Sequence, residues 1–260
     1  MKLDRVFFGL GLIGLGILSL VFGDFALQWQ PVPEWGSGRT LLAYASGVVM
    51  ILGGAGLLWR RTAKLSSGVL LVYSLAWVLL LKLPHVVMMP LQELNWLGFG
   101  EIAVIVAGAW VIFAEERGQA ESSSLKFATG ANGVRIARII FALALIPIGL
   151  SHFVYATQTI GFIPTWLPFR PFWAYLTGAG HIAAGLGVLF GIVPRLAAQL
   201  EAAMIGVFTA LVWVPLVVKD PASQLNWTGF FISWTIGAAA WVVAESLTSK
   251  RSPSTSRVAA

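Results

Sequence analysis

The chain has 260 residues, of which 58% are hydrophobic and only 11% are charged, and its mean hydropathy is +0.83. Soluble domains carry roughly 25% charged residues. The composition therefore excludes an ordinary water-soluble domain and predicts an all-α, polytopic membrane protein. The formal net charge is +6 and no cysteine is present. The chain can form no disulfide, no thiolate nucleophile and no Cys-ligated zinc or iron–sulfur site.

Apolar runs of about 20 residues predict transmembrane helices. The first run could be mistaken for a secretory signal. Its apolar core, residues 6–22, is longer than the roughly 7–15 residues of a signal peptide, so we expect it to be retained as the first span. Eight spans are predicted, at residues 5–23, 40–59, 66–83, 97–114, 136–155, 171–191, 196–217 and 227–246.

The basic residues predict the orientation of these spans. If the N-terminus is cytoplasmic, all but four of the 17 Lys and Arg residues fall on the cytoplasmic side. The exceptions are Arg39, Lys82, Arg170 and Lys219. By the positive-inside rule, we expect a bacterial inner-membrane protein with both termini in the cytoplasm. Topology accounts for the positive charge, so we expect the lipid bilayer, and no nucleic acid, as its partner.

The chain carries an internal repeat. The stretch Trp173–Leu196 matches Leu42–Leu65 at an offset of 131 positions, and the same offset relates Pro84 to Pro215 and Asn95-Trp96 to Asn226-Trp227. Two parallel four-span halves, related by a pseudo-two-fold axis along the membrane normal, are therefore expected. The predicted parts are a first half at 1–114, a cytoplasmic linker at 115–135, a second half at 136–247 and a disordered tail at 248–260.

Several motifs of the second half carry a family resemblance. They are His152-Phe153, Ile163–Pro168, Trp173–Gly187 and Arg195-Leu196-Ala197. Together they resemble the DoxX family of four-span bacterial membrane proteins, and the repeat extends the resemblance to the first half, as a tandem duplication. The resemblance implies an accessory subunit of a membrane redox or quinone-linked system, with a soluble oxidoreductase as partner and a quinone as cofactor. Family members often carry a glutamate within the second span, where this chain has His181 in one half and Met50 in the other.

His181 is the sharpest candidate for a functional residue, because an ionisable group inside the hydrocarbon is a functional-site hypothesis by default. It lies about ten residues into span six, which is roughly 15 Å at 1.5 Å per residue and so near the midplane. It could carry protons, contact a ligand or ligate haem, or it could be a neutral imidazole bonded to a neighbouring helix. Haem is disfavoured because neither His85 nor His152 lies at the midplane to supply a second axial ligand.

The sequence also predicts where four further groups of residues lie. Glu101 and Glu201 are expected as carboxylates near opposite span ends, reaching water. Asn95 and Asn226 are expected to cap the helices they begin, with Trp96 and Trp227 in the interfacial aromatic belt. The proline-rich loop 158–171 is expected to fold back over the second half. A pocket would lie beneath it, between spans five and six, with His152 at its mouth and His181 at its floor; Trp166 and Tyr175 are further ligand-contact candidates.

No catalytic residue and no resident metal are expected. Two alternatives to the redox role remain. One is a binder or transporter of a small apolar molecule or lipid. The other is a structural or assembly protein that uses small-residue faces such as Ala183, Gly187 and Gly191 to hold partners.

Overall fold

The computed structural model describes residues 2–36, 38–118 and 125–248, and within these ranges all regular secondary structure is helical. Eight continuous helical segments are long and apolar enough to cross a membrane, so the chain is an all-α, multi-pass membrane protein. The eight predicted spans are confirmed; the third is longer than predicted and runs over residues 60–88. The elements are α1 (Leu3–Phe22), η1 (Leu27–Trp29), α2 (Gly38–Leu57), α3 (Arg60–Trp77), η2 (Val78–Lys82), α4 (Leu83–Met88), α5 (Glu93–Arg117), α6 (Gly130–Val154), α7 (Ala156–Phe162), α8 (Arg170–Phe190), α9 (Pro194–Phe208), η4 (Thr209–Trp213), α10 (Val214–Lys219) and α11 (Gln224–Ser246).

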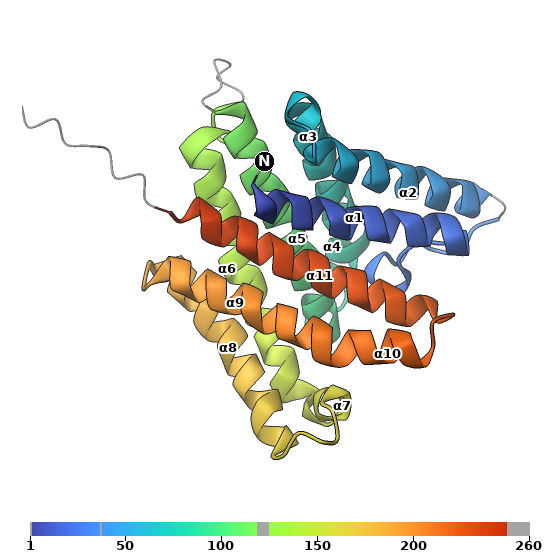
Figure 1. The fold of residues 1–260 in the computed structure, drawn as a ribbon, viewed down its shortest axis with the longest axis vertical. Helices are drawn as coiled ribbons and strands as arrows, with labels where there is room; N and C mark the ends of the chain where they lie inside the picture. The colour runs from blue at the N-terminus through green and yellow to red at the C-terminus, as the bar shows by residue number, and fades with distance from the viewer. Residues whose placement is uncertain (1, 37, 119–124, 249–260) are drawn as a thin grey trace, which may run out of the picture.

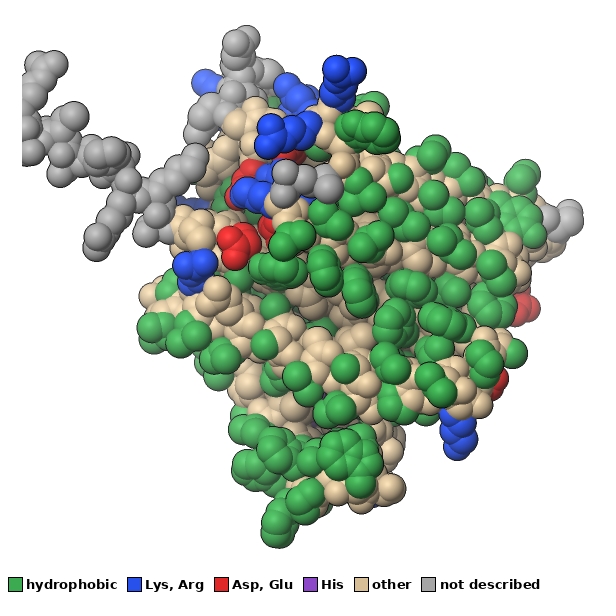
Figure 2. Space-filling model, viewed as in Figure 1, with side chains coloured by type: hydrophobic (Ala, Val, Ile, Leu, Met, Phe, Trp, Pro, Cys, Tyr) green, Lys and Arg blue, Asp and Glu red, His purple; other side chains and the backbone are tan. Residues whose placement is uncertain are grey.

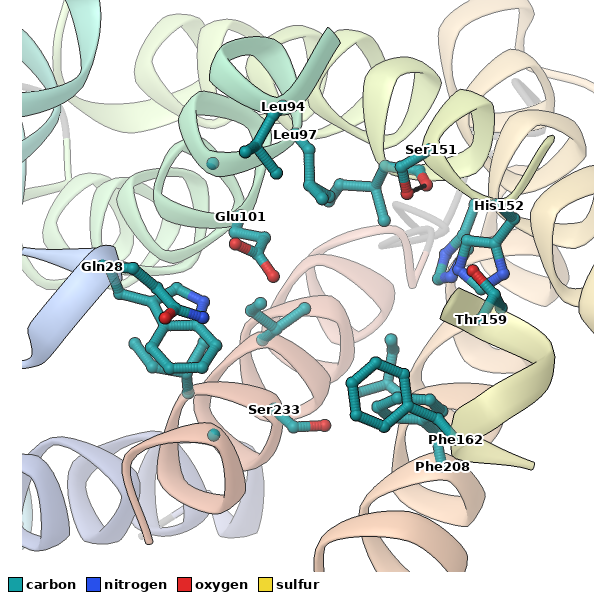
Figure 3. Close-up of a pocket in the computed structure, with 18 of the residues that line it drawn as sticks. Gln28, Leu94, Leu97, Glu101, Ser151, His152, Thr159, Phe162, Phe208 and Ser233 are labelled. Atoms are coloured by element: carbon teal, nitrogen blue, oxygen red, sulfur yellow. Dashed lines mark hydrogen bonds between the residues drawn. The ribbon is translucent and has the colours of Figure 1, made fainter. Parts of the chain in front are cut away.

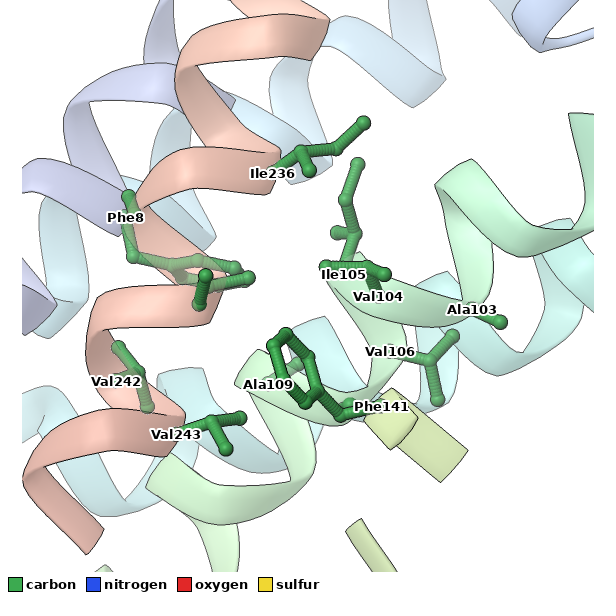
Figure 4. Close-up of a cluster of buried hydrophobic side chains, with 14 of the residues drawn as sticks. Phe8, Ala103, Val104, Ile105, Val106, Ala109, Phe141, Ile236, Val242 and Val243 are labelled. Carbon is green, nitrogen blue, oxygen red and sulfur yellow. The ribbon is translucent and has the colours of Figure 1, made fainter. Parts of the chain in front are cut away.

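The helices α5 and α11 form the centre of the bundle. Each buries 72% of its most apolar stretch, against 22–50% for the other spans. They approach closely at Gly108, where an added Cβ would lie 2.7 Å from the Cβ of Ala239. Phe8 of α1 and Phe141 of α6 pack against this centre and are fully buried (Figure 4). In Figure 1, α11 runs between α1 and α9 through the middle of the view.

Helix contacts in one half have counterparts in the other. α1 packs along α2 and against α11, and α6 packs along α8 and against α5. The backbones meet at glycines in both cases: a Cβ on Gly16 would lie 2.5 Å from the Gly47 oxygen, and a Cβ on Gly149 would lie 2.6 Å from the Gly178 oxygen. Small residues at such crossings let helices pack closely in lipid.

Two π-helical segments interrupt the third and seventh spans. They are η2 and η4, and each is followed by a proline, Pro84 or Pro215, at the second residue of the next helix. Proline has no N–H to donate to the preceding turn, and a wider turn accommodates that loss. Both segments place a side chain, Lys82 or Trp213, against the cavity described below.

The predicted helix caps are wrong. Asn226 does not cap α11: Ser223 does, by accepting a 3.2 Å bond from the Asn226 N–H. The side-chain amide of Asn226 instead donates to the Leu216 oxygen at 3.0 Å, and that of Asn95 donates to the His85 oxygen at 3.2 Å. Each asparagine therefore ties its helix to the short helix before it.

The visible surface is largely hydrophobic, a few charged side chains lie at one end of the bundle, and more of them gather at the other end, where α1 begins and α11 ends (Figure 2). There, Lys2 and Arg5 each bond Glu115 at 2.8 Å. Parts of the predicted linker are helical, because α5 runs to Arg117 and α6 begins at Gly130. Residues 119–124 of that linker, and residues 249–260 of the predicted tail, lie outside the described residues.

Candidate functional site

A cavity of about 610 Å³ lies within the bundle, at the junction of the two halves. Its volume falls within the roughly 300–1,000 Å³ typical of small-molecule sites. It reaches from the middle of α8, at His181, toward the end opposite the two termini, where α7 and the segment after α1 contribute to its wall. Much of the wall is apolar, and includes Trp29, Leu97, Ile148, Phe162, Phe208, Trp213, Ile232 and Ile236.

The first half contributes a lysine and a glutamate to this cavity. Lys82 is buried, and its Nζ donates a 2.8 Å hydrogen bond to the Gln28 oxygen. A Cβ on Gly98 would lie only 2.8 Å from that Nζ, so the glycine leaves room for the lysine. Glu101 of α5 points into the same space, with Gln28 beside it (Figure 3). A basic and an acidic side chain of the first half therefore face one intramembrane cavity.

The second half contributes two histidines. The rings of His152 on α6 and His181 on α8 lie 5.2 Å apart between centroids. His152 Nδ1 lies 3.0 Å from Thr177 Oγ1 and 3.2 Å from the Ala174 oxygen, which fixes the ring against α8. In Figure 3, His152 and Thr159 lie across the cavity from Glu101. The hydrogen-bonding groups of the two halves thus face each other.

His181 has a buried acidic partner, Glu201 on α9. Its Nδ1 lies 2.8 Å from Glu201 Oε1, and the side chains are 4% and 0% exposed. Glu201 Oε2 is buried without a hydrogen-bond partner. The prediction that Glu201 reaches water near a span end is wrong, because α9 turns this residue inward against α8. Pairing offsets part of the large desolvation cost of burying both groups.

The predicted site residues divide into two groups. His152 and His181 line one cavity, as expected, and Glu101 lines it too. The cavity is wider than predicted, because its walls come from both halves and are not confined to spans five and six. Trp166 and Tyr175 do not line it: they are 70% and 44% exposed, and Tyr175 stacks on Phe153 at 5.7 Å.

Loop 158–171 contributes to the cavity only through its helical part. Thr159 and Phe162, both on α7, line the wall.

The sequence analysis missed Lys82, which was assigned to the outer side of the membrane. The sequence does contain an indication that Lys82 lies within a span. Lys82 follows an unbroken apolar run and precedes Pro84, and a proline marks a place where a transmembrane helix is interrupted.

The site offers hydrogen-bond donors, acceptors and groups that exchange protons. Within the described ranges, no group of three or more His, Asp or Glu side chains is arranged to hold a metal ion.

Comparison with known proteins gives one family. A family model described as a domain of unknown function, DUF8561, matches residues 141–244. That stretch runs from α6 into α11 and contains His152, His181 and Glu201, but covers less than half of the chain. No curated protein and no solved structure matches.

Proposed function

We propose that this protein binds a small amphiphilic molecule in the central cavity, as a membrane-embedded binder or transporter. One observation carries the proposal: a cavity of about 610 Å³ lies among transmembrane helices and combines apolar walls with Lys82, Glu101 and three histidines. Polar groups within a bilayer are costly unless they have partners. A ligand with a polar head would supply such partners, and its apolar body would fill the remaining space.

The arrangement of polar groups constrains that ligand. Lys82 supplies N–H donors on one wall, and Glu101 can accept a hydrogen bond beside it. His152 and Thr177 supply further groups on the opposite wall. A head group that both donates and accepts hydrogen bonds fits this set better than a hydrocarbon does.

We also propose that the two halves are duplicated DoxX-like units in a bacterial inner membrane, with both termini cytoplasmic. The recurring helix contacts support the duplication, and the gathering of charged residues at the termini's end of the bundle supports the orientation. The role as accessory subunit of a redox or quinone-linked system, with a soluble oxidoreductase partner, rests on the family resemblance alone and stays a prediction. A quinone, with its reduced quinol form, is one member of the proposed ligand class, since it joins an apolar tail to a head that accepts hydrogen bonds as the quinone and also donates them as the quinol.

Native mass spectrometry of gently extracted protein tests the ligand proposal. The wild type is expected to carry a bound small molecule. The double variant Met204→Tyr/Phe208→Trp adds bulk at two cavity-lining positions of α9 and should lose it. Val207→Trp is the matched control, because it adds bulk on the same helix at an exposed position and should retain the molecule. A wild type that carries no small molecule, or equal occupancy in all three proteins, would contradict the proposal.

A further inference from the structure

A second cavity lies on the other side of the His181–Glu201 pair. This groove between α8 and α9, about 400 Å³ in volume, is lined by apolar side chains such as Leu196 and Leu200 and by Glu201. It reaches the turn between α8 and α9 through Ile192 and Val193, both of which are exposed. We call it the α8/α9 groove.

The pair stands between the two cavities. His181 lines the central cavity and Glu201 lines the α8/α9 groove, and a 2.8 Å hydrogen bond joins them. The wall is thin at this point, because Met204 lines both spaces. The Nδ1 of His181 faces Glu201, so Nε2 is the ring nitrogen left for the central cavity. On the other side, Glu201 Oε2 is buried and has no hydrogen-bond partner.

We propose that His181 and Glu201 transfer protons between the central cavity and the α8/α9 groove. Packing alone requires no ionisable group here, and both members of the pair are of the kinds that form proton relays in membrane proteins. His152 lies 5.2 Å from His181 on the cavity side, and Lys82, His85 and Glu101 are the other titratable groups of that cavity. On the groove side, Glu201 is the only titratable residue in the described part of the chain that lines the groove.

The transfer balances over one cycle. In the resting state the imidazole is neutral, and its Nδ1–H donates to the Glu201 carboxylate. A proton from the central cavity binds Nε2, and the Nδ1 proton moves to Oε1. The carboxyl group rotates and releases this proton from Oε2 into the groove. One proton has entered and one has left, and the imidazole now carries its proton on Nε2. A flip of the neutral ring turns this N–H toward Glu201 and Nδ1 toward the central cavity, so the next cycle runs with the two ring nitrogens exchanged.

Proton flux into vesicles tests the proposal without any other ligand. The purified protein is reconstituted in liposomes that contain a pH-sensitive dye, and a valinomycin-driven potassium potential draws protons inward. The wild type should acidify the lumen faster than protein-free vesicles do. Glu201→Gln, which keeps the shape but cannot exchange a proton in this way, should fall to the protein-free rate. Glu245→Gln, the same change at a glutamate that lines neither cavity, should keep the wild-type rate.

Two further variants separate proton transfer from a structural role. Glu201→Asp retains a titratable carboxyl and should restore part of the flux lost in Glu201→Gln. His181→Gln serves as a second test if Glu201→Gln fails to fold, and it should also lose the proton flux. The proposal is overturned if wild-type vesicles acidify no faster than protein-free ones, or if a folded Glu201→Gln or His181→Gln protein conducts like the wild type. Because these rates need no bound amphiphile, they are independent of the mass-spectrometric test above.

Discussion

The two predicted halves have matching helix contacts, but the space between their helices is filled differently. In the first half, Gln30 Nε2 donates to Ser46 Oγ at 3.2 Å and to the Tyr73 hydroxyl at 2.9 Å, and the two hydroxyl oxygens lie 2.6 Å apart. Beside them, the Trp77 indole donates to the Trp29 oxygen at 2.7 Å. Large side chains and a closed set of hydrogen bonds therefore occupy the space between these helices.

In the second half, the positions 131 residues later hold different side chains. Gly161, Thr177, Met204 and Phe208 stand where the first half has Gln30, Ser46, Tyr73 and Trp77. The last three of these line the central cavity. Likewise His181 and Glu201 replace Met50 and Leu70, which are buried and apolar. Both halves thus line the central cavity, but only the second has open space between its own helices at these positions and carries the His181–Glu201 pair.

Removing one member of the His181–Glu201 pair should give the largest effect on stability. His181→Met alone leaves the Glu201 carboxyl buried without its partner, which should cost about 3–5 kcal/mol. The double variant His181→Met/Glu201→Leu reproduces the first-half residues and should regain most of that loss. Thermal unfolding in detergent measures both, with Met50→Leu as the control, for which a change of under about 1.5 kcal/mol is expected. Equal losses in the single and double variants would show that the pair contributes nothing beyond its packing.

Substitutions at the matching helix crossings should destabilise the protein equally in both halves. Gly16→Val and Gly149→Val each force a side chain against the backbone of the neighbouring helix, and each should cost about 1–3 kcal/mol. Gly206→Val is the control, because a Cβ at that position meets no atom within 4 Å. The same unfolding measurement applies. A loss confined to one half would mean that the two helix crossings are not equivalent.

Much of the frame could be predicted from the sequence, since spans are set by long apolar runs and by the thickness of the bilayer. The offset of 131 relates most of the matching sequence positions, but the helix contacts of the first span in each predicted half follow another offset. There the contacts match at 133: Gly47 faces the Ser19 Cβ and Gly178 faces the His152 Cβ. His152 therefore corresponds in its packing to Ser19, where the sequence offset assigned Val21.

The site was harder to predict because its partners lie on different helices. His181 was found because a histidine in an apolar span is conspicuous. Its pairing with Glu201 depends on how α9 is rotated against α8, and the nearly uniform apolar character of a transmembrane span gives little indication of that rotation. The direction in which a side chain points therefore requires the packed structure. Lys82 was assigned to the outer side for a different reason, because the third span runs to residue 88 and was predicted to end at residue 83.

The smallest expected effects on stability concern the starts of α5 and α11. Some hydrogen bonds there are present in both halves, and one is present in the second half alone. Asn95→Ala and Asn226→Ala each remove an amide that donates to the preceding short helix, and each should cost about 0.5–1.5 kcal/mol. Asn95→Ala should reduce the free energy of unfolding somewhat more than Asn226→Ala, because the Asn95 amide also lies 3.3 Å from the Met89 oxygen.

The cap at Ser223 has no counterpart in the first half, and this makes it the sharper test. Gln92 occupies the equivalent position and makes no side-chain cap bond, whereas Ser223 accepts from the Asn226 N–H. Ser223→Ala should therefore cost about 1 kcal/mol, and Gln92→Ala should cost nothing that unfolding can measure. If the two changes cost the same, the difference in helix capping between the halves has no energetic consequence, and the asymmetry of the molecule is confined to the cavity and the His181–Glu201 pair.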